Sequence, residues 1–187
     1  MNHFLGFFID DQSRKKIVES VGNMSDIFSD IGIQVRWIKP SNYHIKLQSL
    51  NGDIGPIKKL YISKKIEEIF KEPVSVSMGN IKLGTNRNMR SLLYMEMENG
   101  GDALRELKYE MAKTLRLKDS MHFLPHVAIG RMNKDLSNQE VSNIIKDIRN
   151  VSESINRNEI QFDINEIDLV RVKEGDYEIL KNFKVSS

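Results

Sequence analysis

The sequence of 187 residues contains no cysteine. This absence excludes disulfides, cysteine-based zinc sites and cysteine nucleophiles, and it is compatible with a reducing cytoplasm, where we expect the protein to act. Neither sign of charge is in large excess, because 28 Lys and Arg side chains against 26 Asp and Glu give a formal net charge of +2. Such a balance does not by itself indicate nucleic-acid binding, so an anionic partner must be recognised locally.

Long hydrophobic runs are absent as well. The apolar start, residues 4–9, has no basic lead-in and continues directly into Asp10 and Asp11. It is too short for a signal peptide or for a membrane span, which needs about 20 apolar residues, so we expect a buried first strand and no membrane partner. No low-complexity stretch or long linker divides the chain, and 40% hydrophobic residues suffice for a core, so residues 1–187 are expected to form one domain.

Apolar residues at three- and four-residue steps predict four helices. The first ends near Gly32, the second begins at Pro56, the third covers the region around residue 107, and the fourth begins with a capping box, Ser137 and Glu140. The predicted core-facing residues are Ile17, Val21, Met24, Ile27, Phe28 and Ile31; Ile57, Leu60, Tyr61, Ile66, Ile69 and Phe70; Leu104, Leu107, Met111 and Leu115; and Val141, Ile144, Ile145 and Ile148.

Alternating apolar residues predict the strands between these helices. The order helix, histidine-containing strand, helix occurs twice, and residues 160–172 and 177–185 are expected to form a hairpin around Glu174, Gly175 and Asp176 that completes the second sheet. The sequence therefore predicts an α+β fold with two lobes and a cleft between two sheets.

Two histidines, His44 and His126, lie at matching places in the two predicted strands, each among alternating apolar residues. Since successive side chains of a strand point to opposite faces, His44 shares a face with Lys46, and His126 shares one with Ala128. Two imidazoles facing one cleft could perform acid–base chemistry on a substrate held between the lobes. The alternative is that each is an ordinary strand histidine, but the repeated context favours a functional pair.

These residues resemble the two-histidine phosphoesterase superfamily, and within it the RNA 2′,3′-cyclic phosphodiesterases that are also called 2′-5′ RNA ligases. The resemblance runs nearly end to end, and it includes residues 36–40 before the first histidine strand, residues 122–125 before the second, and Arg131 after it. Each family motif is a histidine, an apolar residue, a threonine or serine, and another apolar residue. The two histidines lie 82 positions apart, which is similar to the family's spacing.

The resemblance implies a pseudo-symmetric bilobal fold with two antiparallel-rich sheets facing a central groove, acting without a metal or a nucleotide cofactor. It also implies an RNA-processing reaction in which water opens a 2′,3′-cyclic phosphate end, or a small cyclic nucleotide, to leave a 2′-phosphate; the reverse reaction would be 2′-5′ ligation. One imidazole would take a proton from water while the other gives one to the departing 3′-oxygen. We assign His44 as the acid and His126 as the base, although the sequence does not fix this order.

Lys46 and Ala128 stand where the family has threonine or serine. The family hydroxyls would hydrogen-bond the phosphate, whereas alanine offers no donor and lysine offers a mobile cation. Loss of one such donor can lower the rate by ~10²-fold or more. Lys46 could compensate by binding the phosphate, although its charge would also lower the pKa of His44. A solvated strand lysine is the alternative.

Arginines supply further candidates for anion binding. In a regular strand Arg131 would face away from His126, but Gly130 permits a bulge that could turn it toward the phosphate; an edge salt bridge is the alternative. Arg87 and Arg90 lie in a polar loop and could guide an RNA backbone, unless they are simply solvated.

Three other side chains, Trp37, Tyr43 and His122, are candidates for base stacking or metal binding. Trp37 and Tyr43 could stack on an unpaired base, but Tyr43 faces away from His44, which favours core packing. His122 precedes His126 by four positions, yet a proline between them argues against a helical metal pair, so we expect no metal.

The sequence leaves three functions open. The leading one is a cytoplasmic, metal-independent cyclic phosphodiesterase, expected to act as a monomer. The main rival is a module that binds phosphorylated RNA ends or nucleotides without useful turnover, and the third is a scaffold with a blocked groove. An open groove with the two histidines and substitute donors would favour the enzyme.

Overall fold

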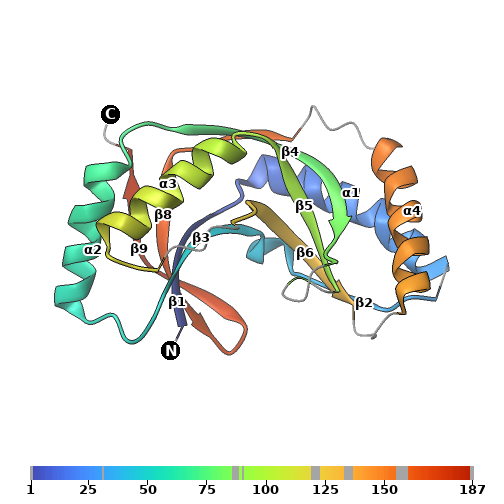
Figure 1. Cartoon of the computed structure of the whole chain (residues 1–187), viewed down its shortest axis with the longest axis horizontal. Helices are drawn as coiled ribbons and strands as arrows, with labels where there is room; N and C mark the ends of the chain where they lie inside the picture. The colour runs from blue at the N-terminus through green and yellow to red at the C-terminus, as the bar shows by residue number, and fades with distance from the viewer. Residues whose placement is uncertain are drawn as a thin grey trace.

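The computed structural model describes residues 2–30, 32–85, 89, 91–118, 123–132, 137–154 and 160–185. Figure 1 shows two sheets flanked by helices. Along the chain the elements are β1 (Asn2–Phe8), α1 (Asp11–Asp30), β2 (Val35–Trp37), a 3₁₀ turn (Pro40–Asn42), β3 (His44–Leu50), α2 (Pro56–Ile69), β4 (Val74–Leu83), β5 (Leu92–Asn99), α3 (Gly101–Thr114), β6 (His126–Met132), α4 (Asn138–Ser154), β7 (Gln161–Ile164), β8 (Glu166–Lys173) and β9 (Asp176–Lys184).

Both sheets are antiparallel. The four-stranded sheet has the order β3-β1-β8-β9, and the five-stranded sheet has the order β2-β6-β5-β4-β7. The first strand of the chain thus lies between β3 and the C-terminal hairpin. One predicted histidine strand belongs to each sheet, and the predicted α+β fold class is confirmed.

The helices divide between the two sheets. α2 packs on β9 and α3 packs on β3, while α4 packs on β4 and α1 packs on α4. In Figure 1, α2 and α3 accordingly lie at one end of the molecule, and α1 and α4 lie at the other. The predicted repeat of helix, histidine strand and helix is confirmed. Within the described residues, no helix combines the length and hydropathy required to cross a bilayer.

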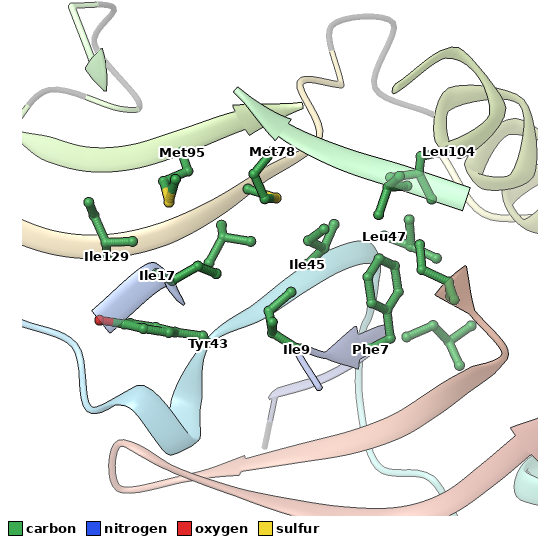
Figure 2. Packing of buried hydrophobic residues seen from close by; sticks show 14 of the residues in the cluster. Phe7, Ile9, Ile17, Tyr43, Ile45, Leu47, Met78, Met95, Leu104 and Ile129 are labelled. Atoms are coloured by element: carbon green, nitrogen blue, oxygen red, sulfur yellow. The ribbon is translucent and has the colours of Figure 1, made fainter. Parts of the chain in front are cut away.

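A single cluster of buried hydrophobic side chains joins the two sheets. Ile45 and Leu47 of β3 pack in the same interior as Met78 of β4, Met95 of β5 and Ile129 of β6 (Figure 2). Burial of one such side chain typically stabilises a fold by about 1.5–3 kcal/mol. The shared core therefore holds β3 and β6, which contact each other, in a fixed relation.

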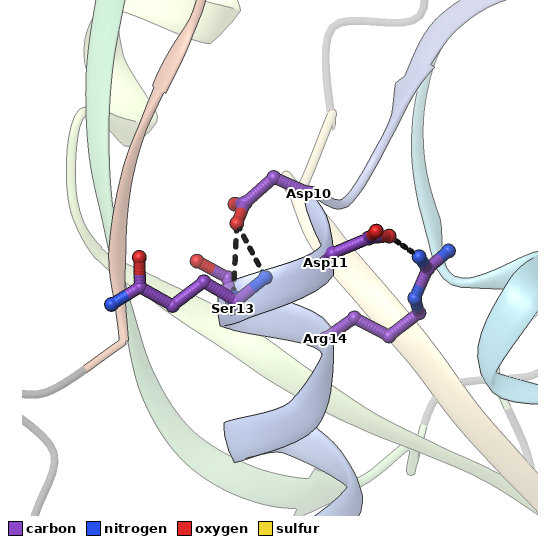
Figure 3. A network of polar contacts seen from close by, with 5 residues as sticks. Asp10, Asp11, Ser13 and Arg14 are labelled. Atoms are coloured by element: carbon purple, nitrogen blue, oxygen red, sulfur yellow. Dashed lines mark hydrogen bonds and ion pairs between the residues drawn. The ribbon is translucent and has the colours of Figure 1, made fainter.

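Two helix starts follow the expected capping chemistry. Asp10 accepts hydrogen bonds from the backbone N–H groups of Gln12 (2.9 Å) and Ser13 (3.0 Å) at the start of α1, beside an ion pair between Asp11 and Arg14 (Figure 3). Burial alone would raise the pKa of Asp10, but these hydrogen bonds together lower it, so the carboxylate stays charged at the positive end of the helix.

The capping box predicted for α4 is confirmed. The Ser137 backbone N–H donates to the Glu140 carboxylate (2.9 Å), and the Glu140 N–H donates to the Ser137 hydroxyl (3.3 Å). These reciprocal bonds satisfy two backbone donors that a helix start leaves without partners.

The prediction for the C-terminal segment was partly wrong. The hairpin around Glu174 and Gly175 exists, but it joins β1 in the four-stranded sheet instead of completing the second sheet. Only β7 joins the five-stranded sheet, through β4. The buried positions show why: Ile164 and Ile167 are both buried but are separated by an odd number of positions, so the alternation changes phase and marks the passage between sheets.

The predicted inner face of α2 was also partly wrong. Ile62 and Ile66 are buried, but Ile57, Leu60 and Tyr61 are exposed, with Ile57 at 86%. At 100° per residue, these three side chains share the stripe opposite Ile62 and Ile66, so helical spacing alone could not assign both stripes to the core.

Gly6 lies at an irregularity in the pairing of β1 and β3. Gly6 pairs with Lys46 and the preceding Leu5 pairs with Gln48, so Leu47 is an extra residue that forms a β-bulge. A Cβ on Gly6 would lie 2.4 Å from the Ile45 carbonyl oxygen and 3.2 Å from the Phe4 ring. Only glycine therefore allows the two strands to approach here.

We predict that Gly6→Ala lowers the free energy of unfolding by about 1–3 kcal/mol, because backbone atoms must move to admit the methyl group. The matched control is Gly22→Ala in α1, where an added Cβ meets nothing within 4 Å. This control is expected to stabilise the protein by about 0.5–1 kcal/mol. Urea unfolding of both variants checks the prediction, and an unchanged midpoint for Gly6→Ala would contradict it.

Candidate functional site

A groove of about 970 Å³ contains residues of both histidine strands, of α3 and of the β8–β9 turn. Its volume lies at the upper end of the range of small-molecule sites, roughly 300–1,000 Å³, so neither a lysine nor a bulky side chain closes it. His44 and His126 both line it. The basic side chains in its wall are Arg36, Lys39, Lys46, Lys108, Lys118 and Arg131.

Each of the two imidazoles is held by an equivalent hydrogen bond to a backbone carbonyl. Nδ1 of His44 lies 2.8 Å from the carbonyl oxygen of Asn42, and Nδ1 of His126 lies 2.7 Å from the carbonyl oxygen of Leu124. A carbonyl oxygen can only accept, so Nδ1 carries the proton in both rings. Each neutral ring therefore leaves Nε2 as a proton acceptor.

Burial lowers the pKa of both histidines below the ordinary value, since a poorly hydrated site disfavours the charged ring. For each ring the hydrogen bond to its backbone carbonyl opposes this effect. The pKa of His44 is lowered further by the positive charge of Lys46 and, when His126 is protonated, by the charge of that ring, so the two rings are near enough to interact. Both imidazoles are therefore mainly neutral at pH 7, and His44 experiences the stronger cationic field.

Lys46 extends along the four-stranded sheet beside His44. The residue as a whole is exposed, but its Nζ lies 5.7 Å from the centroid of the Phe4 ring, and partial loss of water lowers its pKa. Lys46 and Ala128 both line the groove, as predicted from their positions two residues after the histidines. The β3 wall thus carries a cation at this position, and the β6 wall carries only a methyl group.

A bulge in β6 turns Arg131 toward the groove. Ala128 and Gly130 pair with consecutive residues of β5, so Ile129 is an extra residue without a partner. The bulge reverses the alternation of faces, and Arg131 lines the groove together with His126. The bulge that the glycine permits therefore exists.

The corresponding position of β3 is occupied by a serine. The bulge at Leu47 comes three residues after His44, just as the bulge at Ile129 comes three residues after His126. Ser49 therefore occupies in β3 the place that Arg131 occupies in β6, and it also lines the groove. The two walls share one backbone design but carry different side chains.

The remaining sequence candidates have mixed outcomes. Arg87, Arg90 and His122 lie outside the described residues. Tyr43 is 1% exposed, so its predicted core role is confirmed, whereas Trp37 lines the groove with its ring edge toward Phe28 at 6.1 Å. Within the described ranges, no three His, Asp or Glu side chains gather in a way that could hold a metal ion.

Lys108 is a groove residue that the sequence analysis missed. It is only 5% exposed, and its Nζ lies 5.5 Å from the centroid of the Phe123 ring. The sequence carried a signal, because Lys108 belongs to the otherwise apolar stripe of α3, together with Leu104 and Met111, and a lysine is rarely buried without a partner. Tyr177 was missed too, because only the fold brings the C-terminal hairpin beside His44.

The arrangement can transfer protons at an anion. A neutral imidazole accepts a proton through Nε2, and a protonated one donates from the same atom. The surrounding lysines and arginines can neutralise a phosphate bound between the rings.

Comparison with known proteins finds one similar curated sequence, while no family model matches the chain. The RNA 2′,3′-cyclic phosphodiesterase of Aquifex aeolicus (strain VF5) is 27% identical over 155 residues, which is 79% of each chain.

Among solved structures, apo LigT of E. coli has a TM-score of 0.69 at 15% identity and covers 100% of this chain and 98% of its own. The same protein complexed with 3′-AMP has a TM-score of 0.65 at 13% identity, with the same coverage. Usb1 of Kluyveromyces marxianus has a TM-score of 0.61 at 13% identity, covering 98% of this chain and 97% of its own.

Proposed function

We propose that the chain is a two-histidine phosphoesterase of the LigT type and that it hydrolyses 2′,3′-cyclic phosphate ends of RNA to 2′-phosphates without a metal ion. The observation that supports this best is the matched pair His44 and His126, each held through Nδ1 and each lining one open groove. Two prepared proton carriers at one site are what this reaction requires.

In the proposed reaction the cyclic phosphate binds between the two rings. The neutral imidazole takes a proton from a water molecule as the water oxygen attacks phosphorus opposite the 3′-oxygen. The bond between phosphorus and the 3′-oxygen breaks, and the protonated imidazole gives its proton to that oxygen. The products are a 2′-phosphate and a free 3′-hydroxyl, and the proton taken by one ring replaces the one lost by the other.

We propose that His44 is the base and His126 the acid, which reverses the assignment made from the sequence. The charge of Lys46 acts on His44 and favours its neutral form, whereas no such lysine follows His126. A base must be neutral and an acid protonated when the substrate binds, so the asymmetry of the two walls suits this order.

Lys46 and Arg131 are the proposed phosphate ligands. Both line the groove, one on each wall, and both carry charge that can bind the non-bridging oxygens in place of the family hydroxyls. Lys108 and Lys118 extend the positive wall and suit the backbone of a longer RNA. Arg87 and Arg90 are proposed to contact the RNA backbone.

The proposed substrate is inferred from the substrates and ligands named for the similar proteins. The Aquifex relative carries the name RNA 2′,3′-cyclic phosphodiesterase, and E. coli LigT is solved with 3′-AMP. Reversal of the reaction with a 5′-hydroxyl would give a 2′-5′ linkage. We propose that the monomer acts in the cytoplasm, which agrees with a chain free of cysteine.

A second function is favoured by Ala128. Its side chain offers no hydrogen-bond donor on the β6 wall, so stabilisation of the transition state is weaker there than a hydroxyl would provide. The alternative protein would bind RNA ends or nucleotides in the same groove without useful turnover.

We predict that the purified protein, without divalent metal, converts an RNA oligonucleotide ending in a 2′,3′-cyclic phosphate to the 2′-phosphate. His44→Ala and His126→Ala are each expected to lower the rate by ~10²- to 10⁴-fold, because each removes one proton carrier. Chromatographic separation of the terminal phosphates is the measurement. His3→Gln is the control, since His3 is buried outside the groove wall. RNA binding without turnover in the unaltered protein would favour the binding function instead.

A second prediction concerns Lys46→Gln. The charge of Lys46 lowers the pKa of His44, so its removal is expected to raise that pKa. If His44 is the base, the acidic limb of the kcat/KM profile moves to higher pH, and the rate falls by ~10-fold or more from loss of a phosphate ligand. The pH–rate profile and an NMR titration of His44 measure this, with the exposed Lys64→Gln of α2 as control. Movement of the alkaline limb alone would show that His44 is the acid.

A further inference from the structure

Each imidazole of the groove meets a tyrosine ring edge-on. The Tyr177 and His44 ring centroids are 4.8 Å apart with the planes inclined at 63°, and those of Tyr94 and His126 are 5.2 Å apart with the planes inclined at 67°. We propose that Tyr177 and Tyr94 are matched positioning residues, each of which fixes the plane of one imidazole and shields it from water. The kinetic consequences of this positioning role rest on the proposed phosphodiesterase function.

Tyr177 completes an aromatic cluster around His44. Phe4 stacks on His44 at 5.0 Å with an interplanar angle of 27°, and Tyr177 contacts Phe4 at 5.7 Å and Phe8 at 5.9 Å. Phe4 and Phe8 face the same side of β1, and Gly6 between them carries no side chain on that side. The His44 and Tyr177 rings therefore pack over a floor of two phenylalanines, and Tyr177 also lines the groove.

Tyr94 performs the same role on the other wall with different neighbours. It pairs directly with Ala128 across β5 and β6, while Glu96 pairs with His126. Adjacent side chains on one face of paired strands lie close together, and the small side chain of Ala128 leaves room for the phenol ring beside the imidazole. Tyr94 is 7% exposed, so little water reaches that side of His126.

The Nδ1 hydrogen bonds alone do not fix the direction of Nε2. A single bond to a carbonyl holds one atom of the imidazole, and the ring can still tilt about that contact. An edge-on aromatic neighbour at about 5 Å restricts the plane of the ring, which is the remaining freedom. Because a displacement of about 1 Å at a reacting centre can lower a rate by ~10²-fold, the second restraint has a catalytic consequence.

The tyrosines restrain their histidines without adding charge. Burial raises the pKa of both Tyr177 and Tyr94, so both phenols are neutral across the pH range in which histidine titrates. The groups whose positive charge acts on His44 are Lys46 and, when it is protonated, His126. Loss of the Tyr177 ring would therefore change the burial of His44 and leave the charges around it in place.

The test compares Tyr177→Phe, which keeps the ring, with Tyr177→Ala, which removes it. Tyr109→Ala is the matched control, because Tyr109 is 53% exposed on α3 and lies outside the groove wall. NMR titration of the free protein gives the pKa of each histidine without any substrate, and kcat and KM are measured with the cyclic-phosphate RNA. The NMR result thus tests the positioning role even if the proposed activity fails.

We expect Tyr177→Ala to raise the pKa of His44 toward its ordinary value, to leave His126 unchanged, and to lower kcat by ~10- to 10²-fold with little effect on KM. Tyr177→Phe and Tyr109→Ala should match the unaltered protein. Equal shifts of both histidines, or no shift, would overturn the proposal in favour of a general structural role. A loss in Tyr177→Phe equal to that in Tyr177→Ala would also overturn it, since the hydroxyl and not the ring would then matter.

The reciprocal variant, Tyr94→Leu, provides a second measurement in case Tyr177→Ala disturbs the fold of the whole protein. It is expected to raise the pKa of His126 and to leave that of His44 unchanged. Circular dichroism and thermal unfolding confirm that each variant is folded. A folded Tyr94→Leu protein with an unshifted His126 would contradict the role of Tyr94.

Discussion

The site depends on a short hydrogen bond from each imidazole to a carbonyl two residues earlier in the chain. Asn42 supplies this carbonyl to His44, and Leu124 supplies it to His126. The acceptor belongs to the segment that enters the histidine strand, so the backbone itself selects the protonated nitrogen and leaves Nε2 as the proton acceptor. Because the same bond recurs in both sheets, one local geometry used twice gives two imidazoles that share one tautomer, as the proposed proton transfer requires.

The shared core and the two bulges convert this local geometry into a groove. Buried side chains from both sheets form one cluster, which keeps β3 against β6. The bulge three residues after each histidine then reverses the alternation, so Ser49 and Arg131 face the same groove as the histidines. A strand without the bulge would place Arg131 on the opposite face. The differences between the walls, Lys46 against Ala128, are imposed on a symmetric backbone and make the two histidines electrostatically unequal.

Much of the fold followed from periodicity, because helices and strands each bury one face. Periodicity predicted the order of the helices, the repeated local context of His44 and His126 predicted the pair, and the spacing of Ser137 and Glu140 predicted the capping box. Gly130 indicated that a bulge was possible in β6. Periodicity could not choose between the two apolar stripes of α2, since burial of one depends on what packs there. It also could not place Tyr177 beside His44, because that contact joins β3 and β9, two strands that are far apart in the sequence. Pairings of this kind depend on tertiary structure, which no local pattern encodes.

The proposed reaction requires both Nε2 atoms to face one phosphate. ¹⁵N NMR of the histidine rings measures this while a nucleoside 2′-phosphate, the proposed product, is added to the free protein. We expect the ¹⁵N signals of His44 and His126 to shift together with one apparent Kd and a stoichiometry of one, and both pKa values to rise as the anion favours the charged rings. A response from only one histidine, or two responses with separate affinities, would contradict it.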